Sequence, residues 1–458
     1  MSSFQDLQLI EPLQRAVAEV GYAEMTPVQA ASLPAILAGK DVVAQAKTGS
    51  GKTAAFALGL LSKLDASIAQ LQGLVLCPTR ELADQVSREI RRLASFIPNV
   101  KVLTLCGGVP VRIHLASLTH QPHIAVGTPG RILDLLRKNA LPLPALKTLV
   151  LDEADRMLDM GFADDISDII ERTPKQRQTL LFSATMPDPI REFSRQFQRK
   201  PLDVTVPSHD DAVLIEQTFF DVEPADKLNA LAALLLKYRP ESALVFCNTR
   251  DAVRAVAEEL SHRGFSVIAM HGELEQRERE EMLVRFANHS STVLVASDVA
   301  ARGLDFKELA MVINYDLATD TDAHIHRIGR TGRAGVPGIA LSLCSMRDTA
   351  RATQIAQQQG QPLKWQKLPA SSSATTPLYA PFITLAIDAG RQDKLRPGDV
   401  LGALTGDAAL PAEAIGKIDV FPTRTYVAIA RKWGDKATQR LRAGKIKGRT
   451  FRIRTISR

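Results

Sequence analysis

Short apolar runs alternate with helical patterns through about residue 368 of this 458-residue chain. Helical stretches such as Glu81–Phe96 and Asp251–Arg263 lie between the runs, and this alternation is typical of parallel sheets with crossover helices. The runs predicted to be buried strands are Asp41–Gln45, Leu74–Cys77, Val100–Leu105, Ile124–Gly127, Thr148–Leu151, Thr179–Ser183, Ala243–Cys247, Ser266–Met270, Thr292–Ala296, Met311–Tyr315 and Ile339–Cys344.

These runs are too many for one sheet. A break at Lys200–Gln217, which contains two prolines, divides them into two α/β domains. The segment Pro369–Pro377 has the composition of a flexible linker. We therefore predict a first domain at residues 1–205, a linker at 206–216, a second domain at 217–368, a linker at 369–376 and a C-terminal module at 377–458.

The C-terminal module has a different pattern, in the order strand, helix, two strands, helix, strand. That order suits a small ferredoxin-like α+β fold of the RNA-recognition type. The predicted strands are Phe382–Ile387, Lys417–Val420, Thr425–Ala430 and Thr450–Ile456, and the predicted helices are Asp399–Leu404 and Lys432–Arg442.

A glycine-rich segment follows the first predicted strand and is typical of a phosphate-binding loop. Its glycines let backbone N–H groups turn inward around phosphate oxygens. Lys52 would reach the β- and γ-phosphates, and the Thr53 hydroxyl would bind Mg²⁺. The segment comprises Ala46, Lys47, Thr48, Gly49, Ser50, Gly51, Lys52 and Thr53, with alanine where the general pattern has its first glycine.

An acidic segment, Asp152–Asp155, follows the apolar run that ends at Leu151. An acidic pair at the carboxyl end of a buried strand can hold the metal, and can orient a water molecule at the γ-phosphate. Alone, such a pair is equally well explained as a solvated turn. Both segments in this order, each after an apolar strand, indicate a nucleoside-triphosphate hydrolase site that uses Mg²⁺. Asp152 would hold Mg²⁺ through water, and Glu153 would orient or deprotonate the attacking water.

Bulk composition argues against a membrane-spanning, a secreted and a cysteine-metal protein. Hydrophobic residues make up 45% and charged residues 23%, as in ordinary globular proteins. No apolar run approaches the ~18 residues that cross a bilayer, and the N-terminus carries no secretory pattern. The four cysteines lack metal-ligand spacing and fit reduced thiols. We expect a cytoplasmic protein without a membrane partner, and a monomer, since no coiled-coil heptads occur.

Positive charge is concentrated at the C-terminal end. The last 84 residues, from Thr375, hold 16 of the 57 basic and 7 of the 50 acidic residues, a net charge of +9. The preceding part holds 41 and 43, a net charge of −2. A basic segment on a near-neutral body is the electrostatic footprint of a nucleic-acid-binding module, although a solvated tail is the plainer alternative.

The remaining motifs occur in a fixed order that resembles the DEAD-box RNA helicases. This resemblance covers about the first 370 residues. It implies two RecA-like domains in tandem and an RNA-dependent ATPase. The motifs that carry it are Gly21-Tyr22, Thr26-Pro27 with Gln29, residues 46–53, Pro78–Leu82, Gly107-Gly108, Thr128–Arg131, Asp152–Asp155, Ser183–Thr185, Phe246–Thr249, Gln276 with Arg279, Ser297–Asp305 and His326–Arg333.

The resemblance also implies roles for individual residues. Tyr22 would stack on the adenine, Gln29, which Thr26 precedes, would read its edge, and Asp305 would bind the ribose. Arg330 and Arg333 would act as arginine fingers from the second domain, so that catalysis requires closure. Coupling between the domains would use Asp155, Ser183, Thr185 and His326. The RNA backbone would be tracked by Arg80, Gly108, Thr128, Arg131, Asn248 and Arg279.

The C-terminal segment resembles the terminal domain of one bacterial subfamily of these helicases, through Arg396–Leu404, Gly416–Ile418 and Gly444–Gly448. That likeness implies binding to a hairpin of large-subunit (23S) ribosomal RNA, with pre-ribosomal particles as partners. The strand Thr425–Ala430 offers Tyr426 but no paired aromatics, so we expect RNA contacts from loops. The candidates are Lys394, Arg396, Lys445, Lys447 and Arg449.

Three functions stay open at this point. The first is an ATP-dependent RNA helicase that remodels duplexes during assembly of the large ribosomal subunit. The second is an ATP-gated RNA clamp that acts as a placement factor, which needs the same closed site. The third is a protein or DNA translocase, which would share the phosphate loop but would not explain the Gln29 segment or the basic module.

Overall fold

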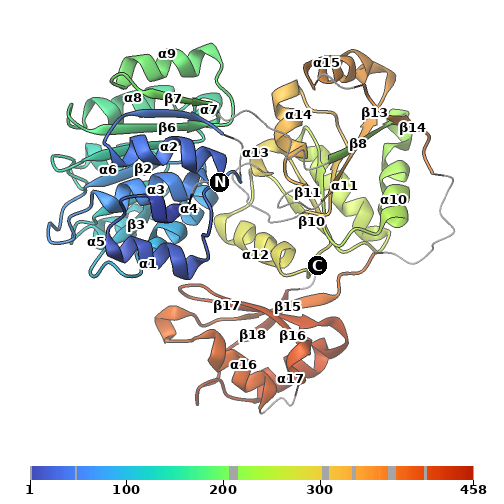
Figure 1. The fold of residues 1–458 in the computed structure, drawn as a ribbon. Helices are drawn as coiled ribbons and strands as arrows, with labels where there is room; N and C mark the ends of the chain where they lie inside the picture. Colours follow the sequence, from blue (N-terminus) through green and yellow to red (C-terminus); the bar gives the residue numbers. More distant parts are fainter. Residues whose placement is uncertain are drawn as a thin grey trace. The chain divides into compact units, whose positions relative to one another are not determined.

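Three β-sheets organise the described residues of the computed structural model, which are 3–46, 49–205, 215–301, 309–332, 337–359, 362–369, 378–406 and 410–456 (Figure 1). The chain forms two compact units. One unit contains the first sheet, and the other contains the second sheet together with the C-terminal module. The predicted fold class, two parallel-sheet α/β domains followed by a small α+β module, is confirmed.

The first sheet is parallel and has the strand order β3-β4-β2-β5-β6-β1-β7. Its strands are β1 (Val42–Gln45), β2 (Gly73–Leu76), β3 (Val102–Leu105), β4 (Ile124–Gly127), β5 (Thr148–Asp152), β6 (Gln178–Ser183) and β7 (Leu202–Thr205). Its helices are α1 (Glu11–Val20), α2 (Pro27–Leu37), α3 (Lys52–Ser62), α4 (Arg80–Leu93), α5 (Val111–Ser117), α6 (Pro129–Arg137), α7 (Ala154–Asp159), α8 (Ala163–Glu171) and α9 (Asp188–Phe197).

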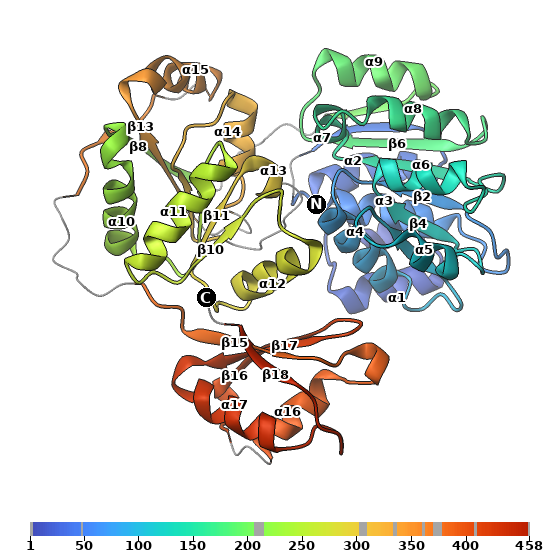
Figure 2. The ribbon, with the colours of Figure 1, turned by 180° about the vertical axis from the view of Figure 1, so that it is seen from behind.

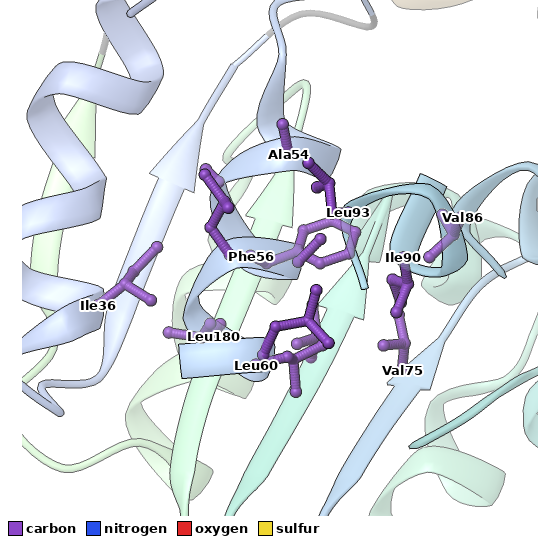
Figure 3. Close-up of a cluster of buried hydrophobic side chains, with 14 of the residues drawn as sticks. Ile36, Ala54, Phe56, Leu60, Val75, Val86, Ile90, Leu93 and Leu180 are labelled. Carbon is purple, nitrogen blue, oxygen red and sulfur yellow. The ribbon is translucent and has the colours of Figure 1, made fainter. Parts of the chain in front are cut away.

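Helices cover both faces of this sheet, which is why its strands are apolar at nearly every position. Neighbouring residues of one strand point to opposite faces, so Val42 joins the core under α1–α4 while Val43 joins the core under α6–α9. Figure 3 shows part of the first core, where Phe56 of α3 lies among side chains of α2, α4 and the sheet. Phe56 is fully buried, with its ring centroid 5.5 Å from that of Phe182.

The second sheet repeats the strand order of the first. Its order is β10-β11-β9-β12-β13-β8-β14, and all its pairs are parallel. Its strands are β8 (Ile215–Asp221), β9 (Ala243–Phe246), β10 (Val267–Met270), β11 (Val293–Ala296), β12 (Met311–Asn314), β13 (Gly338–Cys344) and β14 (Trp365–Gln366). Its helices are α10 (Lys227–Tyr238), α11 (Arg250–His262), α12 (Gln276–Ala287), α13 (Asp298–Ala301), α14 (Thr321–Ile328) and α15 (Thr349–Gln359).

The C-terminal module is a four-stranded antiparallel sheet in the order β16-β17-β15-β18. Its strands are β15 (Phe382–Ile387), β16 (Ile415–Val420), β17 (Thr425–Ala430) and β18 (Ile453–Ile456), and its helices are α16 (Pro397–Thr405) and α17 (Gly434–Ala443). Both helices pack on one face of the sheet (Figure 2), where Leu385 and Ile387 meet Val400 and Leu441. The predicted order of elements is observed.

The opposite face of this small sheet contacts α12 of the second α/β domain. Ala386 and Tyr426 form one apolar cluster with Val284, and Tyr426 is only 2% exposed. Asn288 donates a hydrogen bond to Thr384 at 2.9 Å, and Tyr426 donates one to Glu281 at 3.3 Å. The Tyr426 ring on the central strand β17 is therefore buried by protein.

The structure differs from the predicted pattern mainly at sheet edges. The region expected to be a break, Lys200–Gln217, includes β7 and the beginning of β8, and β14, which has only two residues, was not predicted. In β7 only Val204 is buried, so this edge strand lacks a continuous apolar run. Residues 206–214 and 370–377, within or beside the predicted linkers, lie outside the described residues. Among the residues described, no helix combines the length and apolarity needed to span a membrane.

The core around Phe56 provides a test of the fold. Phe56→Ala should lower the free energy of unfolding of the first domain by about 3–5 kcal/mol, because the lost ring leaves a cavity. Calorimetry of the full chain would measure this change. Ile68→Ala is the control, since Ile68 is an exposed side chain, and it should change stability by less than about 0.5 kcal/mol. Equal effects of the two substitutions would contradict the assigned core.

Candidate active site

The polar motifs of the first domain meet at the carboxyl edge of its sheet. Strands β5, β6 and β1 are neighbours in the sheet and are parallel, so the segments that follow them emerge side by side. These segments are the glycine-rich loop after β1, the acidic residues at the end of β5, and Ser183–Thr185 at the end of β6. The amide of Ala46 donates to the carbonyl of Ser183 at 2.9 Å, which joins the loop to β6.

The described part of the glycine-rich loop has the backbone that such a loop requires. Gly49 and Gly51 have φ angles of 86° and 88°, in the left-handed region that favours glycine. Gly51 caps α3, whose first residues are Lys52 and Thr53. Lys47 and Thr48, predicted to bind nucleotide, lie outside the described residues.

Lys52 and Asp152 form a buried pair across the loop. Lys52 Nζ lies 3.4 Å from Asp152 Oδ1, and the two side chains are 5% and 0% exposed. Burial opposes the charge on Lys52, but the carboxylates of Asp152, Glu153 and Asp155 raise the pKa of its ammonium. Burial raises the pKa of Asp152, and Lys52 opposes that rise.

These buried groups fit a nucleotide with its metal. Within the described residues, Lys52 Nζ, both carboxylate oxygens of Asp152 and the hydroxyl of Ser50 are buried without a hydrogen-bond partner. A phosphate would bind the ammonium, and a hydrated cation would bind the carboxylate. No group of three metal-ligating side chains occurs in the described residues.

The next two acidic residues have partners of their own. Glu153 Oε2 accepts a hydrogen bond from Arg156 Nη1 at 2.8 Å, and both side chains are buried. Asp155 Oδ2 accepts from the amide and hydroxyl of Thr185 at 2.9 and 3.0 Å. The amide of Asp155 donates to the Ser183 hydroxyl at 3.2 Å. The structure thus brings Asp155, Ser183 and Thr185 together within the first domain.

Gln29 joins the beginning of α2 to the phosphate loop. Its oxygen accepts from the Thr26 amide at 2.9 Å, as part of a capping box, and its nitrogen donates to the Gly51 carbonyl at 2.9 Å. The amide nitrogen has a second hydrogen and the oxygen a second lone pair, so each end can make one further bond. The predicted adenine reader therefore contacts the loop directly.

Tyr22, the predicted stacking residue, is half-buried. Its hydroxyl donates to Glu89 Oε1 at 2.7 Å, and its ring is stacked on Phe4 with centroids 5.9 Å apart. Burial and the bond to Glu89 raise the pKa of Tyr22. The sequence analysis did not identify Phe4 as a neighbour of Tyr22.

Four of the predicted RNA-backbone residues lie around one glycine turn. The guanidinium of Arg80 lies against Gly108, where a Cβ atom would collide with it. Thr128 accepts a hydrogen bond from the Gly107 amide at 3.4 Å, and Arg131 donates to the Val109 carbonyl at 2.8 Å. The turn after β3 and the beginning of α6 thus form one surface of the first domain.

The second domain holds its motifs through Arg327, a residue that sequence reasoning missed. Arg327 is 1% exposed and donates to both carboxylate oxygens of Asp298 at 2.6 Å. It also donates to Asn248 Oδ1 at 2.7 Å, and Asn248 Nδ2 donates to the Leu317 carbonyl at 3.0 Å. The only indication of this role in the sequence is that Arg327 lies in the arginine-rich segment His326–Arg333. Asn248, predicted to bind RNA, makes one of these hydrogen bonds at each end of its side-chain amide.

The other predicted residues of the second domain have different surroundings. Arg330 is 4% exposed and follows α14, the helix that carries His326. Arg279 Nη2 donates to the Ala300 carbonyl at 2.8 Å. Asp305 and Arg333 lie outside the described residues.

Three family models match this chain. They are the DEAD/DEAH box helicase domain at residues 26–193, the helicase conserved C-terminal domain at 226–335, and the DbpA RNA binding domain at 384–455. A curated relative, the ATP-dependent RNA helicase DbpA of Escherichia coli, is 54% identical over 457 residues and is matched along all of both chains.

The chain belongs to the DEAD-box family of ATP-dependent RNA helicases.

Other DEAD-box relatives match a smaller share of this chain. The RNA helicase CshA of Listeria monocytogenes is 44% identical over 349 residues, which cover 76% of this chain and 67% of that protein. The solved structure of S. cerevisiae Dbp5 bound to RNA and ADP BeF3 superimposes with a TM-score of 0.72 at 28% identity. It covers 80% of this chain and 96% of that chain.

The predictions of an ATP-dependent RNA helicase, of ATP use and of RNA as a partner are thereby confirmed. The phosphate loop and the acidic segment lie inside the first matched domain. The basic module is the third. A protein or DNA translocase is excluded by this membership.

Gly51 allows a test of the phosphate loop. Gly51→Ala should lower nucleotide affinity at least about tenfold, because the new Cβ would lie 2.5 Å from Gln29 Nε2 on a left-handed backbone. Titration with a fluorescent ADP analogue measures this affinity. Gly161→Ala is the matched control, since Gly161 has a similar φ of 80° but open space around it. Unchanged affinity in the Gly51 variant would show that the Gln29 contact does not shape the site.

Proposed function

We propose that this helicase binds a hairpin of large-subunit (23S) ribosomal RNA through its C-terminal module and remodels nearby duplexes during assembly of the large ribosomal subunit. The match of residues 384–455 to the DbpA RNA binding domain carries this proposal. Pre-ribosomal particles are then its partners, the cytoplasm is its location, and it acts as a monomer.

Within the first domain, the residues divide the work of ATP hydrolysis. Lys52 binds the β- and γ-phosphates, and Thr53 and Asp152 hold Mg²⁺, with Asp152 acting through water. Glu153 orients or deprotonates the attacking water. Tyr22, Thr26 and Gln29 bind the adenine, and Asp305 of the second domain binds the ribose. The Asp152 oxygens support the metal assignment, because they are buried and make no hydrogen bond with any described residue.

The second domain supplies the positive charge that the transferring phosphoryl group needs. Arg330 and Arg333 act as fingers on the γ-phosphate once RNA has closed the two domains. The contacts of Asp155 with Ser183 and Thr185 support a coupling role for that segment, together with His326. Arg80, Gly108, Thr128, Arg131, Asn248 and Arg279 follow the RNA backbone.

RNA contacts of the module come from two turns rather than from its sheet. Lys447 Nζ donates to the carbonyl of Lys394 at 3.1 Å, which joins the turn before α16 to the turn before β18. Lys394, Arg396, Lys445, Lys447 and Arg449 are all exposed there. Two carboxylates are close, with Lys447 3.6 Å from Asp399 and Arg449 3.8 Å from Asp393. The five cations therefore exceed the two carboxylates on this surface.

The central experiment compares RNA substrates. The ATPase rate of the full chain is measured with a 23S fragment that carries the hairpin, with the same fragment after the hairpin loop is changed, and with unrelated duplex RNA. The intact hairpin should stimulate at the lowest concentration. Equal stimulation by all three RNAs would reject the proposed target, while leaving the helicase activity itself intact.

A substitution in the second domain tests the fingers. Arg330→Ala should lower the ATPase rate at saturating ATP and RNA by about 10³–10⁵, because a finger stabilises charge that develops only in the transition state. Affinity for the fluorescent ADP analogue should change little. If the saturated rate survived and only the affinity fell, Arg330 would be a ground-state binding residue.

Removing one positive charge tests whether the two turns of the module bind RNA. Lys447→Ala should weaken hairpin binding and reduce the dependence of log affinity on log salt by about 1, since one phosphate contact is lost. Binding titrations at several salt concentrations measure both effects. Lys364→Ala is the matched control, because its side chain is similarly exposed, 53% against 51%, and also has a carboxylate neighbour. The same loss in both variants would indicate general charge attraction only.

A further inference from the structure

Two buried ion pairs involve the acidic segment, and they differ in distance and in hydrogen bonding. Asp152, Glu153 and Asp155 are all at most 5% exposed, and Lys52 and Arg156 are as deeply buried. Buried carboxylates need partners, because burial disfavours an isolated charge. Lys52 faces Asp152, whereas Arg156 hydrogen-bonds Glu153. Arg156 therefore contacts Glu153, the residue whose carboxylate acts on the attacking water in the proposed mechanism.

The first pair is loosely bound. Its atoms are 3.4 Å apart, and within the described residues neither Lys52 Nζ nor the Asp152 oxygens make a hydrogen bond. A phosphate and a hydrated cation can take over these two charges. The second pair is a hydrogen bond of 2.8 Å between groups that are 6% and 3% exposed. Neither group of that pair is required to bind phosphate or metal, so it can persist when nucleotide binds.

The backbone at Glu153 makes this hydrogen bond informative. Glu153 has φ and ψ angles of 54° and 53°, a left-handed conformation that non-glycine residues rarely adopt. It is the N-cap of α7, and its side chain turns back to Arg156 three residues later. The amide of Arg156 also donates to Asp155 Oδ1 at 3.0 Å, which anchors the arginine's own backbone. The left-handed backbone at Glu153 and its hydrogen bond to Arg156 together fix the position of the Glu153 carboxylate.

We propose that Arg156 is a positioning residue for ATP hydrolysis: its guanidinium holds the Glu153 carboxylate in the orientation from which it acts on the attacking water. This inference rests on the role of Glu153 in the proposed function. Arg156 touches no reacting atom itself. Its loss should therefore reduce turnover and leave nucleotide binding nearly intact.

The test uses the full chain with an in vitro transcript of 23S ribosomal RNA. Arg156→Gln should lower the ATPase rate at saturating ATP and RNA at least tenfold, while affinity for the fluorescent ADP analogue stays within twofold. Arg156→Lys keeps the charge without the planar fork and should give an intermediate rate. Arg137→Gln is the control in the same domain, because it removes an exposed pair with Asp168, and its rate should equal that of the natural chain.

Two further measurements separate positioning from a merely structural role. Melting temperatures show whether the variants fold, and the rate is normalised to folded protein. In single turnover, Glu153→Gln alone tests the role of Glu153, and Arg156→Gln added to Glu153→Gln should cause no further loss. A saturated rate of folded Arg156→Gln within twofold of the natural chain would overturn the proposal, as would an additional loss in the double variant. If Arg156→Gln does not fold, a full rate in Arg156→Lys overturns it instead.

Discussion

Buried charge at the carboxyl edge of the first sheet is the constraint on which the active site depends. Asp152, Glu153 and Asp155 lie almost entirely out of water. Removing one partner from a buried ion pair typically costs about 3–5 kcal/mol. The loop, the acidic segment and Ser183–Thr185 therefore hold one another in place through Lys52 and the amides after β6. The pair that a nucleotide and its cation can replace is the one with the longest separation, Lys52 with Asp152.

The second sheet shows what happens at the same edge without a phosphate loop. Its strand order is identical, but the polar groups that follow β9, β11 and β12 are bonded by Arg327. In the second domain the Arg327 guanidinium, which is part of the protein, contacts the polar groups at this edge. In the first domain a nucleotide that binds and dissociates would contact the corresponding polar groups. In the second domain these motifs are therefore linked to one another by Arg327, whereas in the first domain Lys52 and Asp152 can each bind a charged ligand.

Much of this could be predicted from the sequence, because strands covered on both faces are apolar throughout and the phosphate loop is a local motif. The prediction failed where the physical cause is not local. Strand β7 buries only Val204 and is recognisable only through its pairing with β1. Arg327 looks like an ordinary helix arginine until folding places Asp298, 29 positions away, beside it. The contact of Glu281 with Tyr426 joins residues 145 positions apart, which no pattern in either segment indicates.

The small sheet of the tail explains why its RNA contacts are expected in turns. Successive residues of β15 alternate between two apolar environments, with Leu385 facing α16 and α17 and Ala386 facing α12. Both faces of the central strands are thereby occupied by protein. Tyr426 cannot stack on a base while its ring packs between Phe421 and Val284. The exposed turns that carry Lys394 and Lys447 are built on the same sheet. Burial of the sheet against α12 therefore holds these turns in place while leaving their cations available to phosphate.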